Sequence, residues 1–298
     1  MNIRIPKIYF KLLALLLPFV VACENIEIPS LDNKDDDATC KLKVSISGFD
    51  LSISDIDTRS SIAESDLTKI SFTIFDSNGN TVFSENQVKD VSTHFGEMNC
   101  SLSSGTYSII TVAHQSNAEV SVSPQSVTFE EDGLYGKEVS DTFSAYMSFS
   151  IGDEAEKNLD LNLDRVVALF QLECKDELPA NIKSFKVLFS SGSNSYNPTT
   201  GLALNSKSKL MFYSVDSSNY GKPYQLSAYT FLPQDSVEMD ITVTAVDTSN
   251  EEVKSYIFNK VMMARNKRVR AVGQFFQQTQ TCAVNLNEDW YRSDVLEY

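Results

Sequence analysis

The chain has 298 residues, of which 42% are hydrophobic, and its 25 basic and 40 acidic residues give a formal net charge of −15. This balance argues against nucleic acid as a partner, because phosphate binding draws on clustered positive charge. The length exceeds that of one common sandwich domain and the apolar content suffices for two cores, so we expect two domains.

The apolar run from Leu12 to Cys23 follows the basic residues Arg4, Lys7 and Lys11. A basic flank, a short apolar core and a small residue are typical of a secretory signal peptide, and the run is shorter than the roughly 20 residues that cross a bilayer. Its end, Val20-Val21-Ala22-Cys23, resembles a bacterial lipobox. We therefore expect residues 1–22 to be a lipoprotein signal peptide and Cys23 to carry lipid such as palmitate. The alternative is an ordinary signal peptide with an incidental cysteine.

Residues 23–39 show no sustained periodicity and contain the run Lys34-Asp35-Asp36-Asp37, so they are predicted to be a flexible tether. The acidic run resembles the signal that sends lipoproteins of Bacteroidota-type bacteria to the outer face of the outer membrane. It lies farther from the cysteine than the usual pattern, and simple solvation explains it as well.

From Lys41 the hydrophobic period is two, as in half-buried strands. The segment Lys69 to Phe75 is predicted to form a hairpin with residues 81–83 through the turn at Asn78-Gly79. Asp76, Asn78 and Asn80 faintly suggest a calcium loop, but the glycine is misplaced for an EF-hand, which favours the turn. Residues 108–113 are apolar in succession and predict a central strand.

Further strands predict two tandem β-sandwiches, because short alternating segments recur with Gly, Ser and Asn between them and no long amphipathic helix appears. We place the N-terminal sandwich at residues 40–153 and the C-terminal sandwich at residues 154–298. The boundary lies near Gly152 to Lys157, where charges and glycine gather. The further strand candidates are residues 120–122, 127–129, 145–151, 159–163, 166–170, 185–189, 210–214, 224–231, 239–246, 253–261 and 281–286.

Four cysteines besides Cys23 can form up to two disulfides in an exported chain. Pairing Cys40 with Cys100 and Cys174 with Cys282 keeps each bond inside one predicted domain. Four separate buried thiols are the open alternative, because free cysteine behaves as a small hydrophobe.

The sequence gives an enzyme little support. It has two histidines, His94 and His114, and it lacks the common catalytic and phosphate-binding motifs, so we expect no catalytic residue, no cofactor and no metal. His114 is interpreted as an edge residue of a strand. The one basic cluster, Arg265, Lys267, Arg268 and Arg270, is interpreted as a charged hairpin end between two strands, although it can meet an acidic partner or a lipid headgroup.

Several soft motifs, taken in order, resemble the FimB-type fimbrial anchor family, lipoproteins associated with the type V pili of Bacteroidota-type bacteria. Together they span nearly the whole chain. They are the lipobox ending in Cys23, Ile70 to Gly79, Leu102 to Ala113 with Gly105-Thr106-Tyr107, Leu163-Asp164-Arg165-Val166-Val167-Ala168, and Asn266-Lys267 followed by Gly273.

The resemblance implies two transthyretin-like β-sandwiches and a structural role in fimbriae, with adhesion or biofilm formation as the outcome. In that family's stalk subunits an arginine-specific protease removes the first strand, and a neighbour's C-terminal strand replaces it by strand addition. Arg59 occupies a suitable loop for such a cut, although an ordinary surface arginine is the simpler interpretation. The short segment after Trp290, and the loss of the lipid that a cut at Arg59 would cause, favour an anchor or terminal subunit at the outer membrane.

The alternative function is a glycan-binding outer-membrane lipoprotein of a nutrient-uptake system, with Trp290, Tyr291 and Tyr298 available to stack on sugars. This alternative predicts exposed aromatic side chains gathered in one shallow site. A host ligand is compatible with either function.

Overall fold

The computed structural model describes residues 39–50, 67–130, 138–277, 288–289 and 295–297. In these ranges the regular structure is β-strand apart from one 3-10 turn, η2 (Ser217–Asn219). The chain from Ala38 to Tyr298 is one compact unit. The all-β prediction is therefore confirmed.

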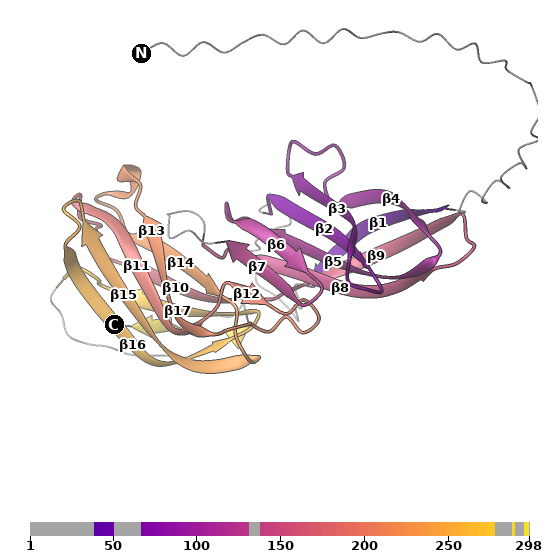
Figure 1. Ribbon diagram of the computed structural model, residues 1–298. Helices are drawn as coiled ribbons and strands as arrows, with labels where there is room; N and C mark the ends of the chain where they lie inside the picture. Colours follow the sequence, from indigo (N-terminus) through magenta and orange to yellow (C-terminus); the bar gives the residue numbers. More distant parts are fainter. Residues whose placement is uncertain (1–38, 51–66, 131–137, 278–287, 290–294, 298) are drawn as a thin grey trace, which may run out of the picture. The chain divides into compact units, whose positions relative to one another are not determined.

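The first sandwich is built from one seven-stranded sheet with the order β3-β2-β5-β8-β9-β1-β4 (Figure 1). Its strands are β1 (Thr39–Asp50), β2 (Lys69–Asp76), β3 (Thr81–Val88), β4 (Glu97–Ser103), β5 (Gly105–His114), β8 (Thr142–Ile151) and β9 (Glu156–Arg165). β8 and β9 pair only at Phe143–Arg165 and Ser144–Asp164. This short junction divides the sheet into two layers, β3-β2-β5-β8 and β9-β1-β4, and both supply residues to one hydrophobic core.

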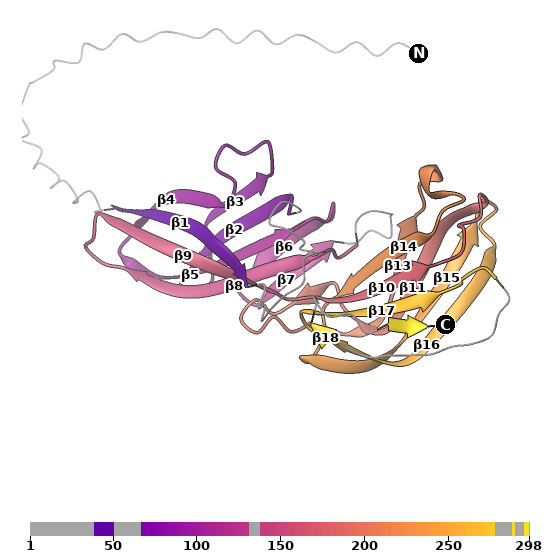
Figure 2. The same ribbon diagram turned by 180° about the vertical axis from the view of Figure 1, so that it is seen from behind.

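The second sandwich has two separate sheets. One has the order β14-β10-β17-β18, with β19 also paired to β17, and the other has the order β13-β11-β15-β16 (Figure 2). The strands are β10 (Ala168–Cys174), β11 (Ile182–Gly192), β13 (Lys207–Ser214), β14 (Tyr224–Thr230), β15 (Ser236–Asp247), β16 (Glu252–Ala264), β17 (Lys267–Gly273), β18 (Glu288–Asp289) and β19 (Val295–Glu297).

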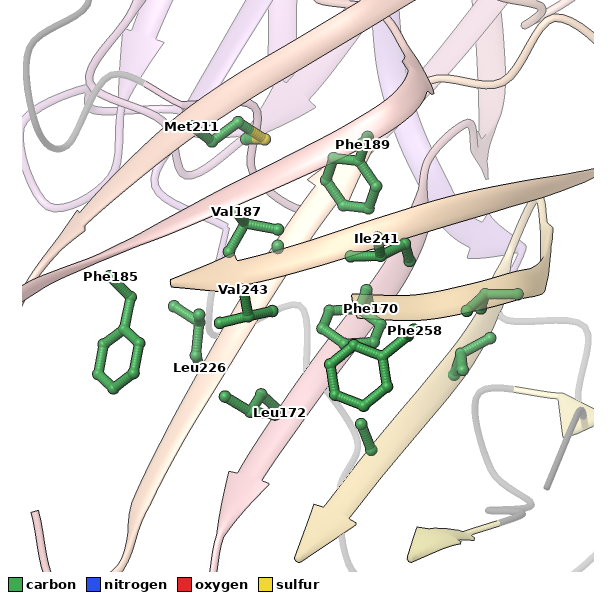
Figure 3. Packing of buried hydrophobic residues seen from close by; sticks show 14 of the residues in the cluster. Phe170, Leu172, Phe185, Val187, Phe189, Met211, Leu226, Ile241, Val243 and Phe258 are labelled. Atoms are coloured by element: carbon green, nitrogen blue, oxygen red, sulfur yellow. The ribbon is translucent and has the colours of Figure 1, made fainter. Parts of the chain in front are cut away.

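The core of the second sandwich fills the space between these sheets (Figure 3). Phe170 of β10 lies against Phe258 of β16, with ring centroids 5.3 Å apart. Phe185, Val187 and Phe189 of β11 are fully buried from the other sheet. Alternating residues of β11 thus point inward, as the hydrophobic period of two predicts.

The two sandwiches repeat one strand order. The layer β4-β1-β9 corresponds to β14-β10-β17, and the layer β3-β2-β5-β8 corresponds to β13-β11-β15-β16. In both, the first and the seventh strand of this shared order are parallel neighbours, β1 with β9 and β10 with β17. The chain therefore contains two copies of one topology without an obvious repeat in its sequence.

A small third sheet has the order β12-β7-β6 and joins β6 (Glu119–Ser123) and β7 (Ser126–Glu130) to β12 (Ser195–Tyr196). It covers Ile110 and Val112 of β5, and a separate core forms there with Phe129, Tyr196 and Phe231. β5 is buried on both faces for this reason, as its continuous apolar run predicts.

The chain changes from the first sandwich to the second at Val166 and Val167, between β9 and β10. The expected boundary between residues 153 and 154 falls in the turn before β9, and β9 pairs with β1 in the first sheet. Hydrophobic periodicity shows where strands occur but not which strands pair with each other. For this reason β9 was expected in the second domain.

Candidate functional site

The candidate site is β1 and its position between β9 and β4. β1 is the first described element of the chain, and it follows the predicted tether directly. It pairs in parallel with β9 and antiparallel with β4. Cys40, Leu42 and Val44 are 1%, 1% and 0% exposed and point into the core, so β1 is an integral strand of the sandwich.

The outward side chains of β1 are polar and lie over an open depression of about 390 Å³. Lys41 faces Glu156 of β9 in the register, and Lys43 forms an ion pair with Glu97 of β4 at 3.4 Å. Asn99 also lines the depression. Leu42 and Cys100 line it as well, so the depression combines charged, amide and apolar groups.

At the opposite end of β9 the chain is held by a buried ion pair between Arg165 and Asp141. Nε of Arg165 donates to Oδ1 of Asp141 at 2.7 Å and Nη2 donates to Oδ2 at 3.1 Å, and both side chains are 0% exposed. Nη1 donates to Oδ1 of Asn266 at 3.1 Å, and the guanidinium lies 4.5 Å from the centre of the Phe143 ring. Charges are buried without large cost only when they are paired in this way.

A polar crevice of about 330 Å³ adjoins this ion pair. It is lined by Asp164, Arg165, Asp235, Arg265 and Asn266. The Arg265 guanidinium forms an ion pair with Asp235 at 2.6 Å, and its Nη1 donates to the backbone oxygen of Thr200 at 2.8 Å. Arg265 and Asp235 thus pair with each other within the crevice.

The predicted basic cluster extends from the turn between β16 and β17, which contains Arg265, into β17. Lys267, Arg268 and Arg270 lie in this strand, which had been interpreted as a connection between strands. Arg270 donates to Oε1 of Glu173 through Nε at 2.8 Å. Burial, followed by the charge of Arg270, lowers the pKa of Arg268. Three of the four basic residues are therefore part of the sheet.

Cys40 and Cys100 lie on adjacent strands and are free thiols, so they do not form the predicted disulfide. The register places Cys40 opposite Leu102 and Cys100 opposite Leu42, so the two are offset by two residues. Burial raises the pKa of both thiols, that of Cys100 to about 11, which disfavours the reactive thiolate. Cys174 is buried, and the proposed partner Cys282 lies outside the described residues.

Cys23, Arg59 and the acidic run at residues 35–37 also lie outside the described residues, as do Trp290, Tyr291, Tyr298 and the predicted strand at residues 281–286. Lipidation at Cys23 and cleavage at Arg59 stay predictions. In the part of the chain that the structure describes, no helix has the length and apolar character to span a membrane. No group of three potential metal ligands occurs in those ranges either.

His114 is 2% exposed at the end of β5, and its ring meets Phe129 edge-on with centroids 5.2 Å apart. Burial, aided by the charge of Lys69, lowers the pKa of His114 to about 4. A neutral buried imidazole is a poor base at neutral pH.

The loop after β2 is a turn, as expected. Oδ1 of Asp76 accepts hydrogen bonds from the backbone N–H groups of Asn78 and Asn80, both at 2.8 Å, and Gly79 has a φ of +82°. The hydrogen bonds from Asn80 lower the pKa of Asp76. The carboxylate therefore closes the turn through hydrogen bonds to the backbone.

Exposed aromatic side chains do not gather in one shallow site among the described residues. The large exposed hydrophobic residues there include one aromatic, Tyr146, at 40%. Its hydroxyl is 3.0 Å from Oγ of Ser148. The glycan-binding alternative therefore lacks the feature that it predicts in these ranges.

Two features of the site were not predicted from the sequence: the buried ion pair and the parallel pairing of β1 with β9. Arg165 gave a local signal, because it directly precedes the apolar run from Val166 to Phe170. Asp141 gave none, since its partner is 24 residues away. The pairing of β1 is also long-range, and period alone does not determine it.

Solved structures resemble this chain distantly. A protein from Bacteroides thetaiotaomicron proposed to bind polysaccharides has 11% identity and a TM-score of 0.47, with 72% of this chain and 79% of that chain covered. A proposed adhesin from Bacteroides ovatus has 16% identity and a TM-score of 0.46, with 73% and 76% covered. The fimbrial anchor protein Mfa2 from Porphyromonas gingivalis has 12% identity and a TM-score of 0.45, with 78% and 90% covered. TM-scores below 0.5 assign no function to this chain.

A search of the curated proteins finds no match. The resemblance to FimB-type fimbrial anchors stays a prediction. One family model matches residues 118–296, which are more than half of the chain. The chain therefore belongs to the family described as "Family of unknown function (DUF6562)".

Proposed function

We propose that this chain is a non-enzymatic surface lipoprotein of the outer membrane that acts as a fimbrial anchor or accessory subunit and supports adhesion or biofilm formation. The observation that carries the proposal is the place of β1. The strand that directly follows the predicted lipid tether lies between two other strands, with its inner residues buried. A lipid on Cys23 is thus connected to the interior of the first sandwich through a short segment.

In this role, pilus subunits join the chain by strand complementation. An unpaired strand edge binds an extended segment through main-chain hydrogen bonds, and alternate side chains fill pockets in the core. Leu42 and Val44 of β1 make this kind of contact inside the chain itself. In an anchor β1 stays in place, because a cut at Arg59 would separate both β1 and Cys23 from the rest of the chain.

Lipidation is tested by growing cells with labelled palmitate. We expect label in the wild type and none in Cys23→Ser, because the thiol is the acceptor of the lipid. Cys40→Ser is the matched control, since it removes a buried thiol of β1 and should keep the label. Label in Cys23→Ser would contradict lipidation at this residue.

The role in fimbriae is tested by cross-linking in intact cells, followed by mass spectrometry of the partners. We expect pilus subunits joined to this chain, and a loss of fimbriae from the cell surface when Cys23→Ser replaces the wild type. Cross-links to glycan-uptake proteins in place of pilus subunits would favour the alternative function.

A further inference from the structure

The direction of its two terminal strands determines how the first sandwich would respond to tension. β1 and β9 are parallel, and their register begins with Lys41 opposite Glu156. Parallel strands run in the same direction, so Thr39, where the chain enters β1, and Arg165, where it leaves β9, lie at opposite ends of the pair. Tension between these two points acts along the strands.

Hydrogen bonds and an ion pair fix the residues where the chain leaves β9. Arg165 is fixed by its buried ion pair with Asp141, and the backbone N–H of Val166 donates to the oxygen of Thr142 at 3.0 Å. The next residue, Val167, accepts a hydrogen bond from the backbone N–H of Asn266 at 2.8 Å. A force that leaves the sandwich here is spread over contacts to β8 and to the turn before β17.

Thr39, where the chain enters β1, can move along the strand axis only if β1 slides between β9 and β4. β1 is paired on both sides, with β9 from Lys41 onward and with β4 from Thr39 to Ser45. A shift along the axis would break both ladders together and would pull Leu42 and Val44 from their buried positions. A shift by one residue would also turn these side chains to the solvent face.

We propose that the first sandwich is a shear clamp that resists extraction of β1 when tension enters through the tether. The clamp rests on the proposed function, because the tether bears tension only if Cys23 is held by the membrane while a partner pulls elsewhere. Its hydrogen bonds share the load in parallel. The same bonds break one after another when the strand is lifted from its other end.

The second sandwich repeats the geometry. β10 and β17 are parallel neighbours, with a register from Leu169 opposite Arg268 to Cys174 opposite Gly273. A force that enters β10 at Ala168 and leaves β17 at Gly273 also acts along the pair. The parallel pair of the second sandwich therefore has the same shear geometry, and β18 and β19, which follow β17 in the chain, also pair with β17.

The clamp is tested by pulling single molecules of the unacylated chain from residue 23 to residue 298. One handle is a peptide tag at residue 23, and the other is a peptide tag at Tyr298. In the comparison, the first handle is moved to an azide-bearing side chain at position 47, near the other end of β1, where Ser47 is exposed. The second sandwich is loaded identically in both experiments and serves as the internal control.

We expect the first sandwich to unfold at a force at least about twofold higher when it is pulled from residue 23, because forced unfolding follows the unfolding barrier in the direction of pulling. The force at which the second sandwich unfolds should be the same in both experiments. Equal forces, or a lower force from residue 23, would overturn the clamp. Ser47→Ala should keep the wild-type force from residue 23, since it removes only the hydrogen bonds of Ser47 Oγ to Leu161 and Asn162.

This measurement uses purified protein and no membrane, so its outcome is independent of lipidation. A weak first sandwich together with palmitate on Cys23 would contradict the clamp and leave the proposed function intact. A strong first sandwich without palmitate would contradict the lipid anchor and leave the clamp intact.

Discussion

Two fully buried charges, on Arg165 and Asp141, fix the residue at which the chain leaves the first sandwich. Removing one partner of such a pair leaves the other charge buried and uncompensated, and this typically costs about 3–5 kcal/mol. We expect Arg165→Met to lower the free energy of unfolding by that amount in urea titrations. Lys157→Met is the control, because its pair with Glu154 is solvent-accessible and its loss should cost less than about 1 kcal/mol.

A second replacement separates the buried charge from the lost packing. Arg165→Met combined with Asp141→Leu removes both charges, and apolar replacement of a buried pair is often neutral. The double variant should therefore regain much of the stability that Arg165→Met loses. A double variant less stable than Arg165→Met alone would contradict this account of the pair.

Gly201 and Gly221 form a matched test of close packing at the residue scale. Both have a φ of +70°, so an added methyl group strains the backbone equally. At Gly201 a Cβ would lie 2.6 Å from Nη1 of Arg265 and 3.1 Å from Cγ1 of Val166, whereas at Gly221 it meets nothing within 4 Å. Gly201→Ala should destabilise the protein by about 1–2 kcal/mol more than Gly221→Ala in thermal unfolding. Equal losses would contradict the close contact.

His114 makes stability depend on pH. Its folded pKa of about 4 lies below the ordinary value of 6.5, so the unfolded chain binds a proton first as the pH falls. The contribution of neutral His114 to the free energy of unfolding is fully present above about pH 6.5. It falls by about 3 kcal/mol as the pH is lowered toward 4. We expect urea titrations of His114→Leu to show a smaller loss of stability across this window. An unchanged slope in His114→Leu would contradict the assignment.

At the scale of the element, β1 carries its stabilising contacts on one face. Leu42 is 1% exposed, and replacing a buried leucine by alanine costs about 2–5 kcal/mol. Lys43 points outward in an exposed ion pair that contributes less than about 1 kcal/mol. Leu42→Ala should therefore unfold at much lower urea concentration than Lys43→Ala. Similar midpoints for the two variants would show that β1 is not integrated in the core.

Local patterns predicted many of the strands. The alternation of Leu42 and Val44 identified β1, and Asn78-Gly79 identified the hairpin of β2 and β3, because both signals depend on neighbouring residues. The partner of each strand depends on contacts far along the chain, and the assignment of β9 to the first sheet could not be read from its period. β17 was missed because its charged residues alternate with only a few small apolar ones.

The candidate site was predicted less completely than the fold. The sequence marked Arg165 within a motif, yet its partner Asp141 is distant and has no pattern of its own. The pairing of Cys40 with Cys100 followed from domain membership, whereas the register offsets the two residues. Residues meet across strands according to register, and register is set by the whole sheet.

At the scale of the whole molecule, the two sandwiches share one topology and are joined by contacts beyond the linker. The backbone N–H of Phe129 donates to the oxygen of Asn194 at 2.9 Å, and Nδ2 of Asn194 donates back to the oxygen of Phe129 at 2.7 Å. These bonds extend the pairing of β7 with β12. The two sandwiches are therefore connected by hydrogen bonds as well as by the chain at Val166 and Val167.

The central claim, that the mature chain keeps β1 and is held through Cys23, is tested most directly by the intact mass of the native protein extracted from cells. We predict a chain that begins at acylated Cys23 and continues through β1 and Arg59 without a break. A mature chain that begins at Ser60, free of lipid and of β1, would contradict the account.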